Sequence, residues 1–251
     1  MKRLIRRTWQ ALRAEGFQQT CKLGRQWIIS RGRSLRYEPA CKVCAMKPTP
    51  AFERTDGSPR IAVQVHLFYP ELLEETIACT NRIPYAFDCY LSTDTQEKAA
   101  LIRERFALDS HATKVVVTCF ENRGRDIAPL LLQLGSVLER YDYLLHLHTK
   151  YSKHGGFGNR WRIYLLRTLL DSPNYIAALL AKMEEEPRIG LVFQRTYWLV
   201  KPSLGWKNNR RKSRAILARM GIADYMVEIP QFPTGDMFWG KTAALAPVFR
   251  C

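Results

Sequence analysis

Residues 114–148 read KVVVTCFENRGRDIAPLLLQLGSVLERYDYLLHLH and contain, in order, the patterns of a strand, a helix and a second strand. Lys114–Phe120 is rich in β-branched residues, which favours a strand. Residues 126–141 are apolar at helical spacing, and Tyr143–His148 is a short apolar run. Two strands joined by a helix predict a parallel βαβ unit.

The same alternation extends outward in both directions from this unit. We predict strands over 61–69, 87–92 and 189–193, helices over 70–80, 95–106, 161–170, 174–185 and 212–220, and a strand or turn over 232–239. This order predicts an α/β fold with a mostly parallel central sheet. In such sheets, ligands bind beyond the carboxyl ends of the strands.

The first 60 residues differ in composition from the rest of the 251-residue chain. Residues 1–60 carry 14 Lys and Arg against 4 Asp and Glu, so they hold most of the net charge of +16. Residues 1–36 read as a basic amphipathic helical extension, suited either to an anionic membrane surface or to packing against the main domain. Residues 37–60 read as a proline-containing linker, and 61–251 as the main domain.

The chain lacks the sequence signals of export. No run of about 18 apolar residues is present, and no apolar segment follows the basic start, so we expect a cytoplasmic protein. The seven cysteines fit a reducing compartment. Cys41 and Cys44 form an isolated CxxC pair without the second ligand pair that a structural zinc site needs.

Polar residues gather at four predicted strand ends. These ends are His66–Tyr69, Ser92–Asp94, Asn122–Asp126 and His146–Lys150. A parallel sheet places all four at one edge. Asp94 is expected to accept hydrogen bonds from a nucleobase or ribose.

The segment Asn122-Arg123-Gly124-Arg125-Asp126 has the chemistry of a diphosphate site. Gly124 allows close backbone approach, the two arginines offer guanidinium forks, and a helix N-terminus follows. Asp126 would cap this helix or orient an arginine. The alternative is an ordinary surface turn with an aspartate N-cap.

His146 and His148 alternate on one strand and therefore share a face. Two histidines without an added carboxylate make a poor Mg²⁺ or Mn²⁺ site, so hydrogen bonding to a sugar or phosphate is the preferred interpretation. Lys150 supplies a point charge for a leaving diphosphate.

Five motifs in order resemble the rhamnan synthesis protein F family. They are ENRGRDIAPLL, YDYLLHLHTKYSKH, the following WR, IGLVFQ and FPTGDMFWGKTAAL, within about residues 61–249. The resemblance implies a glycosyltransferase A-like (GT-A-like) nucleotide-binding sandwich. It also implies rhamnose transfer, from dTDP-rhamnose to a lipid-linked glycan, in surface polysaccharide synthesis.

By this likeness, the donor site comprises Asn122, Arg123, Gly124, Arg125, His148, Thr149 and Lys150, with Asp94 at the nucleoside. The Asp-x-Asp metal motif of such enzymes is replaced by His-Leu-His-Thr-Lys, so we expect transfer without a metal, although Mg²⁺ or Mn²⁺ stays an alternative. Asp236 stands where the family has a small residue, and Asp126 or Asp236 is the candidate catalytic base. The chain ends twelve residues after Trp239, so we expect a shortened acceptor side.

Aromatic and amide residues complete the predicted site. Trp206 and Trp239 are candidates for stacking on an acceptor sugar, with Asn208 hydrogen bonding to its hydroxyls; the alternative for each tryptophan is a place in the core. A non-catalytic membrane-associated scaffold is the alternative function. Nucleic acid is not expected as a partner, because the charge lies mainly outside the main domain and no nucleic-acid-binding motif is present.

Overall fold

The computed structural model describes residues 57–150, 158–201, 204–222 and 232–250. The predicted extension 1–36 and nearly all of the linker 37–60 lie outside these residues. The chain divides into two compact units, one of residues 46–197 and 205–251 and one of residues 1–45 and 198–204. All six described strands belong to the first of these units.

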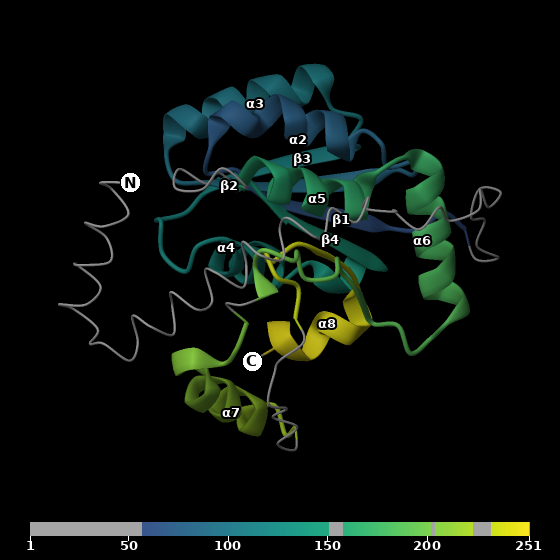
Figure 1. Cartoon of the computed structure of the whole chain (residues 1–251). Helices are drawn as coiled ribbons and strands as arrows, with labels where there is room; N and C mark the ends of the chain where they lie inside the picture. Colours follow the sequence, from purple (N-terminus) through teal and green to yellow (C-terminus); the bar gives the residue numbers. More distant parts are fainter. Residues whose placement is uncertain (1–56, 151–157, 202–203, 223–231, 251) are drawn as a thin grey trace, which may run out of the picture. The chain divides into compact units, whose positions relative to one another are not determined.

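A six-stranded sheet forms the centre of this unit (Figure 1). Its strands are β1 (Ile61–His66), β2 (Phe87–Thr93), β3 (Lys114–Cys119), β4 (Tyr143–His148), β5 (Leu191–Val192) and β6 (Phe238–Lys241). The order across the sheet is β3-β2-β1-β4-β6-β5. Strands β1 to β4 pair in parallel, whereas β6 pairs antiparallel with β4 and β5. The predicted α/β class with a mostly parallel sheet is confirmed.

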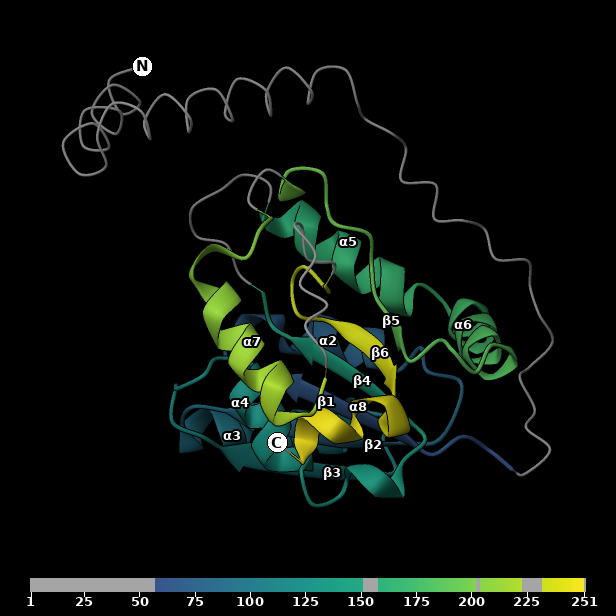
Figure 2. The ribbon, with the colours of Figure 1, turned by 90° about the horizontal axis from the view of Figure 1, so that it is seen from below.

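Helices cover both faces of the sheet (Figures 1 and 2). They are α2 (Leu73–Thr80), α3 (Gln96–Asp109), α4 (Ile127–Leu134), α5 (Gly158–Leu170), α6 (Pro173–Glu185), α7 (Arg210–Arg219) and α8 (Thr242–Phe249), with short 3-10 helices η1 (Pro70–Leu72), η2 (Leu138–Arg140) and η4 (Lys207–Asn209). Among these described helices, none is long and apolar enough to cross a membrane.

The alternation of side chains along β1 explains the two layers. Ile61, Val63 and Val65 enter one core with residues of α2, α3, α5 and α6. Ala62 points the other way, into a smaller core with Leu130 and Leu134 of α4. Because successive residues of a strand face opposite sides of the sheet, this one fully buried strand supplies both cores at once.

The predicted helix over 126–141 is shorter in the structure. Helix α4 ends at Leu134, and residues 138–140 form the separate 3-10 helix η2. The break falls at Gly135, the residue type with the lowest helix propensity after proline. The antiparallel β6 was predicted only as strand or turn structure, and α8 was not predicted.

The strand order reverses between β1 and β4. From β1 the chain continues outward to β2 and β3 with α2 and α3 on one face, and it then returns to β4 with α4 on the other. Such a reversal opens a crevice at the carboxyl ends of the two central strands, where α/β proteins bind ligands. Here those ends carry His66 and His148.

Candidate functional site

The predicted convergence of strand ends is present at this crevice. The backbone N–H of Thr149 donates to the oxygen of His66, and that of Leu67 donates to the oxygen of Ser92. The carboxyl ends of β4, β1 and β2 are therefore adjacent. Asp126, at the start of α4, reaches the same place, since its Oδ2 lies 3.5 Å from Nε2 of His146.

Asp126 occupies the N-cap position of α4 without capping it. Its side chain makes no hydrogen bond to the helix N-terminus and turns toward β4 instead. The residue is 7% exposed and faces His146, which is fully buried. The surface-turn alternative is therefore wrong for Asp126, because its carboxylate is committed to the sheet.

Electrostatics distinguish the two candidate bases. Burial raises the pKa of Asp126, but the nearby rings of His146 and His148 outweigh that effect and bring the pKa to about 2. Burial raises the pKa of Asp236, and the negative charge of Asp126 raises it further. The two carboxylates are thus close enough to influence one another's protonation.

Lys150 lies within electrostatic range of both carboxylates. Burial lowers its pKa, and the charges of Asp236 and Asp126 oppose that effect. Its Nζ sits 4.0 Å from the centre of the Trp161 ring, a cation–π contact that holds the ammonium in place. The predicted association of Lys150 with this edge of the sheet is consistent with these contacts.

The turn before β6 carries Asp236 into the site. Gly235 has φ 112° and Asp236 has φ 55°, so the chain turns sharply here. Glycine is favoured at position 235 by this positive φ, and a Cβ there would also lie 2.9 Å from Cδ1 of Leu165, which would have to shift. The backbone oxygen of Gly235 also accepts a 2.7 Å hydrogen bond from Nε2 of His148.

The loop of residues 122–125, predicted to bind the donor and here called the donor loop, is exposed. Asn122, Arg123, Gly124 and Arg125 are all exposed, and Gly124 and Arg125 both have positive φ. A Cβ on Gly124 would lie 2.4 Å from Cβ of Ala128, so the glycine lets the loop rest on α4. A cavity of about 310 Å³ adjoins the loop, lined by Phe120, Glu121, Arg123, Gly124, Ala128, Pro129 and Leu132.

Three predicted site residues have structural contacts that change their interpretation. The Thr149 hydroxyl accepts hydrogen bonds from the N–H groups of Phe68 and Tyr69, so it fastens β4 to the chain after β1. The His148 ring is engaged by Gly235. Trp239 is fully buried and its indole N–H donates to the oxygen of Leu169, so it belongs to the core and does not stack on an acceptor.

Three other predicted residues lie on different elements of the chain. Asp94 forms a 2.6 Å ion pair with Lys98, one turn along the chain. Asn208 is exposed in η4, and Trp206 is half-buried at the start of that helix. Their roles at the nucleoside and the acceptor stay predictions.

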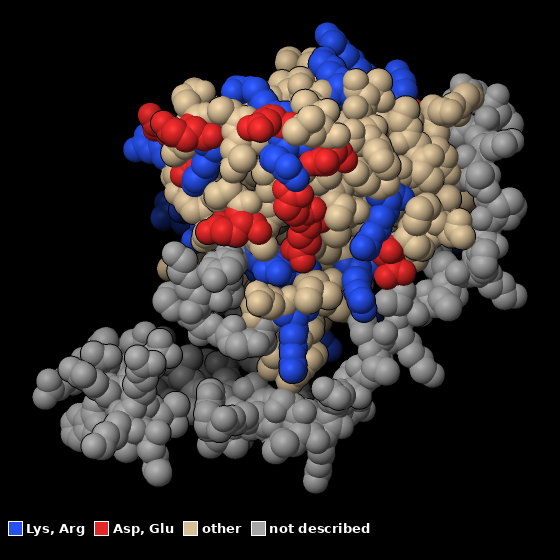
Figure 3. Space-filling view, turned by 90° about the horizontal axis from the view of Figure 1, so that it is seen from above, with Lys and Arg blue, Asp and Glu red and all other residues tan. Residues whose placement is uncertain are grey.

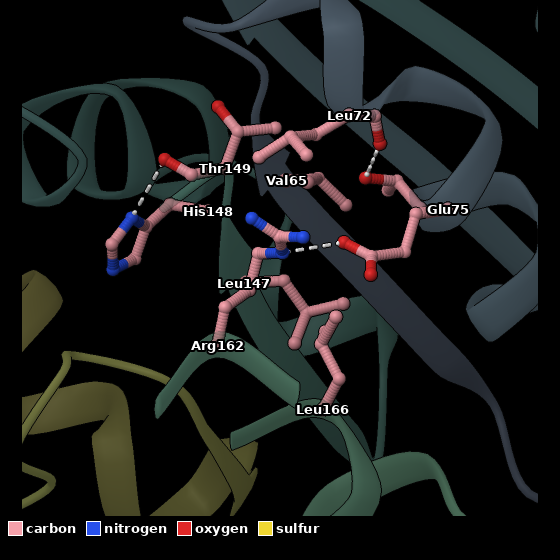
Figure 4. Close-up of a pocket in the computed structure, with 9 residues that line it drawn as sticks. Val65, Leu72, Glu75, Leu147, His148, Thr149, Arg162 and Leu166 are labelled. Atoms are coloured by element: carbon pink, nitrogen blue, oxygen red, sulfur yellow. Dashed lines mark hydrogen bonds and ion pairs between the residues drawn. The ribbon is translucent and has the colours of Figure 1, made fainter. Parts of the chain in front are cut away.

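A second pocket lies on the other face of β4. Figure 4 shows Val65 and Leu147 in its wall, with Arg162 of α5 in a 2.8 Å ion pair with Glu75 of α2. Its volume is about 10 Å³, room for one water molecule at most. This pocket is therefore too small for a sugar nucleotide.

Basic and acidic side chains are interspersed on the face over α2 and α3 (Figure 3). Arg105 of α3 pairs with Glu74 of α2 and with Asp109. Paired charges of this kind leave no continuous basic surface on this face, whereas nucleic-acid binding requires one.

The donor atoms of the site decide whether a metal ion would fit. Across the described part of the chain, no group of three or more His, Cys, Asp or Glu side chains is arranged to hold a metal ion. The Asp126–His146 pair offers one oxygen and one nitrogen, while Mg²⁺ and Mn²⁺ favour oxygen ligands. The described residues therefore do not fit a magnesium or manganese centre, and metal-independent transfer stays a prediction.

The family assignment rests on sequence comparison. The model of the family described as rhamnan synthesis protein F matches residues 27–251. This chain belongs to the rhamnan synthesis protein F family. The resemblance inferred from the five motifs is thereby confirmed.

Two relatives and one solved structure resemble the chain. The relatives are the uncharacterized protein WxcX from two strains of Xanthomonas campestris pv. campestris, each 28% identical over 241 residues. The match covers 94% of this chain and 32% of each relative, so the chain spans about a third of their length. A mannosyltransferase of Pyrobaculum calidifontis, solved with GDP-Man and Mn²⁺, aligns with 91% of this chain and 57% of its own at 12% identity and a TM-score of 0.42. At that score the likeness decides neither fold nor activity.

Sequence reasoning missed three residues of this site. Gln64 and Gln133 hydrogen bond within it, and Trp161 supports Lys150. His146 was expected to hydrogen bond to a sugar or phosphate, whereas it is fully buried behind Asp126. The sequence did contain evidence for a role of Gln64, because a glutamine within the mostly apolar strand IAVQVH requires buried hydrogen-bond partners.

Proposed function

We propose that this member of the rhamnan synthesis protein F family is a glycosyltransferase of surface polysaccharide synthesis. In this proposal it transfers rhamnose from dTDP-rhamnose to a lipid-linked glycan. The observation that carries the proposal is the cluster of Asp126, Asp236 and Lys150 at the strand-order reversal, beside an exposed arginine–glycine loop.

The donor diphosphate would lie between this loop and Lys150. Arg123, Arg125 and Lys150 bring three positive charges to one edge of the sheet, enough to offset a diphosphate without a metal ion. Electrostatic stabilisation of the departing nucleoside diphosphate would then come from these side chains. Asp94 would contact the nucleoside.

The acceptor would approach from the side of Asp126 and Asp236. One of these carboxylates would take the proton of the attacking hydroxyl, as a general base within hydrogen-bond reach. Trp206 and Asn208 are proposed to bind the acceptor sugar. Work at the inner face of the membrane would suit the basic residues 1–36, since each Lys or Arg near anionic lipid contributes about 1 kcal/mol.

The proposal is tested by incubating the chain with a panel of sugar nucleotides, dTDP-rhamnose among them, and membrane glycolipid. We expect transfer of the sugar, unaffected by EDTA, and loss of donor binding in Lys150→Ala. Abolition by EDTA with recovery on adding Mn²⁺ would contradict the metal-independent mechanism. Donor binding without turnover would support the scaffold alternative over the enzyme.

A further inference from the structure

A chain of side-chain amides, one buried and one half-buried, connects the sheet backbone to His146, which faces Asp126. Nε2 of Gln133, on α4, donates to the backbone oxygen of Leu91 at 3.0 Å. Nε2 of Gln64, on β1, lies 3.4 Å from Oε1 of Gln133. Oε1 of Gln64 lies 2.6 Å from Nδ1 of His146.

This relay, formed by Gln133 and Gln64, determines which nitrogen of His146 carries the proton. A backbone carbonyl only accepts hydrogen bonds, so the Gln133 group that contacts the Leu91 carbonyl is the amide NH₂. The amide oxygen of Gln133 therefore faces Gln64. Gln64 must then turn its NH₂ to Gln133 and its oxygen to His146. An amide oxygen accepts only, and therefore Nδ1 of His146 bears the hydrogen.

A second contact of Gln64 agrees with this orientation. Nε2 of Gln64 also donates to Oγ of Ser92 at 3.2 Å. The Ser92 hydroxyl then has its own hydrogen free for Nδ1 of His66, 3.0 Å away. Each link of the network thus has one donor and one acceptor.

The consequence appears at the other nitrogen of His146. In the neutral ring Nε2 has a lone pair, and it faces Oδ2 of Asp126 at 3.5 Å. Both atoms are buried and neither has another hydrogen-bond partner. Without the relay, the ring would place its hydrogen on Nε2 and donate to the carboxylate. The relay prevents that arrangement. Nε2 of His146 and Oδ2 of Asp126 then face one another as two acceptors with no hydrogen between them, so the pair can take up one proton.

We propose that His146 is a positioning residue which makes Asp126 the base of the reaction. The relay holds the hydrogen of His146 on Nδ1, so Nε2 is free to accept a proton. Asp126 takes the proton of the attacking hydroxyl and passes it to this nitrogen. This inference rests on the proposed function. The hydroxyl oxygen bonds to the anomeric carbon, and the bond from that carbon to the diphosphate oxygen breaks with its electron pair on the nucleoside diphosphate. The proton passes to Asp126 and then to Nε2, and water receives it after product release.

Asp236 is the rival base, and the relay decides between the two. A carboxylate with a raised pKa is ordinarily the better base, which favours Asp236 over an isolated Asp126. The nitrogen behind Asp126 changes this comparison, because the proton need not remain on the carboxylate. Burial lowers the pKa of His146, so the ring is neutral and able to accept before the reaction.

Four titratable groups of the described residues act on His146 or lie in its vicinity. Asp126 faces it from the start of α4, Asp236 from the turn before β6, His148 from its own strand and His66 from β1. Phe238 covers the ring, with centroids 5.5 Å apart. His146 is fully buried, so it acts through Asp126 and not by touching the substrate.

The tautomer is tested without any activity measurement. ¹⁵N-labelled full-length chain at neutral pH is examined for the two ring nitrogens of each histidine. The chain has five histidines, and the signals lost in His146→Gln identify the ring. We expect a neutral His146 with its hydrogen on Nδ1. A neutral ring with its hydrogen on Nε2 would overturn the proposal.

Two variants cut the relay at different links, and one control leaves it intact. In Gln64→Leu the hydrogen of His146 should move to Nε2, and in Gln133→Leu, at a half-buried position, the two tautomers should mix. Thr118→Val removes a hydroxyl that contacts Gln133 but leaves the Leu91 contact, so its tautomer should match the unaltered chain. An unmoved hydrogen in a folded Gln64→Leu chain would contradict the relay.

The catalytic consequence is measured on the same variants. We expect kcat to fall about tenfold or more in Gln64→Leu with KM unchanged, and to keep its value in Thr118→Val. Asp126→Asn should reduce kcat more than Asp236→Asn. The reverse ranking would assign the base to Asp236 and overturn the proposal. Binding of one Mn²⁺ that is lost in both Asp126→Asn and His146→Gln would also overturn it, since a metal would occupy the place of the proton.

The two proposals fail in distinguishable ways. Absence of sugar transfer with every nucleotide, together with the expected Nδ1 tautomer, would contradict the proposed function and leave the relay standing. Sugar transfer together with the Nε2 tautomer would support the proposed function and contradict the relay.

Discussion

Nε2 of His148 lies 2.7 Å from the backbone oxygen of Gly235, so the end of β4 is fastened to the turn that carries Asp236. The two histidines of β4 therefore contact the two segments that carry the carboxylates of the site, one through a side chain and one through the backbone. His146 faces the Asp126 side chain, while His148 holds the backbone next to Asp236.

Replacing His148 tests this fastening. In His148→Phe the Gly235 oxygen loses its donor, so we expect the free energy of unfolding to fall by about 1–3 kcal/mol. Urea unfolding measures the change. His148→Gln is the matched control, because its amide can still donate, and it should retain most of the stability. Equal stability of the Phe variant and the unaltered chain would show that the bond contributes nothing.

Two glycines of similar backbone conformation test the donor loop. Gly124 has φ 72° with Ala128 in the way of a Cβ, whereas Gly221 has φ 68° and open space. Gly221→Ala should cost about 1 kcal/mol for the left-handed conformation alone. Gly124→Ala should cost clearly more in urea unfolding and should also weaken nucleotide binding, because α4 and the loop must separate. Equal losses in the two variants would contradict the close packing.

The charge of Lys150 is expected to act on the donor. Lys150→Met keeps most of the side-chain length but removes the cation, and we expect nucleotide affinity to fall about tenfold or more. The loss should shrink as salt is added, since screening weakens the interaction in the unaltered chain. Lys182→Met, at an exposed ion pair on α6, is the control and should bind normally. Normal binding by Lys150→Met would remove Lys150 from the donor site.

The stability of the fold is expected to depend on pH through His66. Burial lowers the pKa of His66 from 6.5 to about 4. Between pH 6.5 and about pH 4, this histidine is therefore protonated in the unfolded chain but neutral in the folded chain. Stability is therefore fully present above pH 6.5 and is lost as the pH falls toward 4, by on the order of 2 kcal/mol. Urea unfolding of His66→Leu and of the unaltered chain at about pH 7.5 and about pH 5, on either side of the unfolded pKa, measures this, with the His111→Gln variant as control. A pH slope retained in full by His66→Leu would assign it to other groups.

The two tryptophans predicted for the acceptor should respond differently. Trp239→Leu removes a fully buried indole and is expected to cost about 3 kcal/mol or more in unfolding free energy. Trp206→Leu should leave stability nearly unchanged and raise the KM for the acceptor. Thermal unfolding and acceptor kinetics on both variants decide. A stable Trp239→Leu chain would contradict its place in the core.

The strands and their parallel direction could be predicted because both follow from the local pattern of apolar and polar residues. Ile61–His66 and Tyr143–His148 are apolar runs bounded by polar residues, and the helices between strands force parallel pairing. The antiparallel β6 could not be predicted, because a four-residue strand has no characteristic period. Trp239 could not be placed either, since a tryptophan in a core and one at a sugar site look the same in sequence.

The sequence by itself determined that Asn122–Asp126 and His146–Lys150 meet at one edge of a sheet, because parallel strands share their carboxyl ends. It also placed His146 and His148 on one face, because strand side chains alternate. Only the tertiary structure decided what each histidine does. Gln64, Gln133 and the Gly235 turn come from three separate segments of the chain. Folding brings them together as hydrogen-bond partners, and these partners determine which nitrogen of His146 carries the hydrogen and what His148 contacts. Spacing along the chain does not reveal such partners.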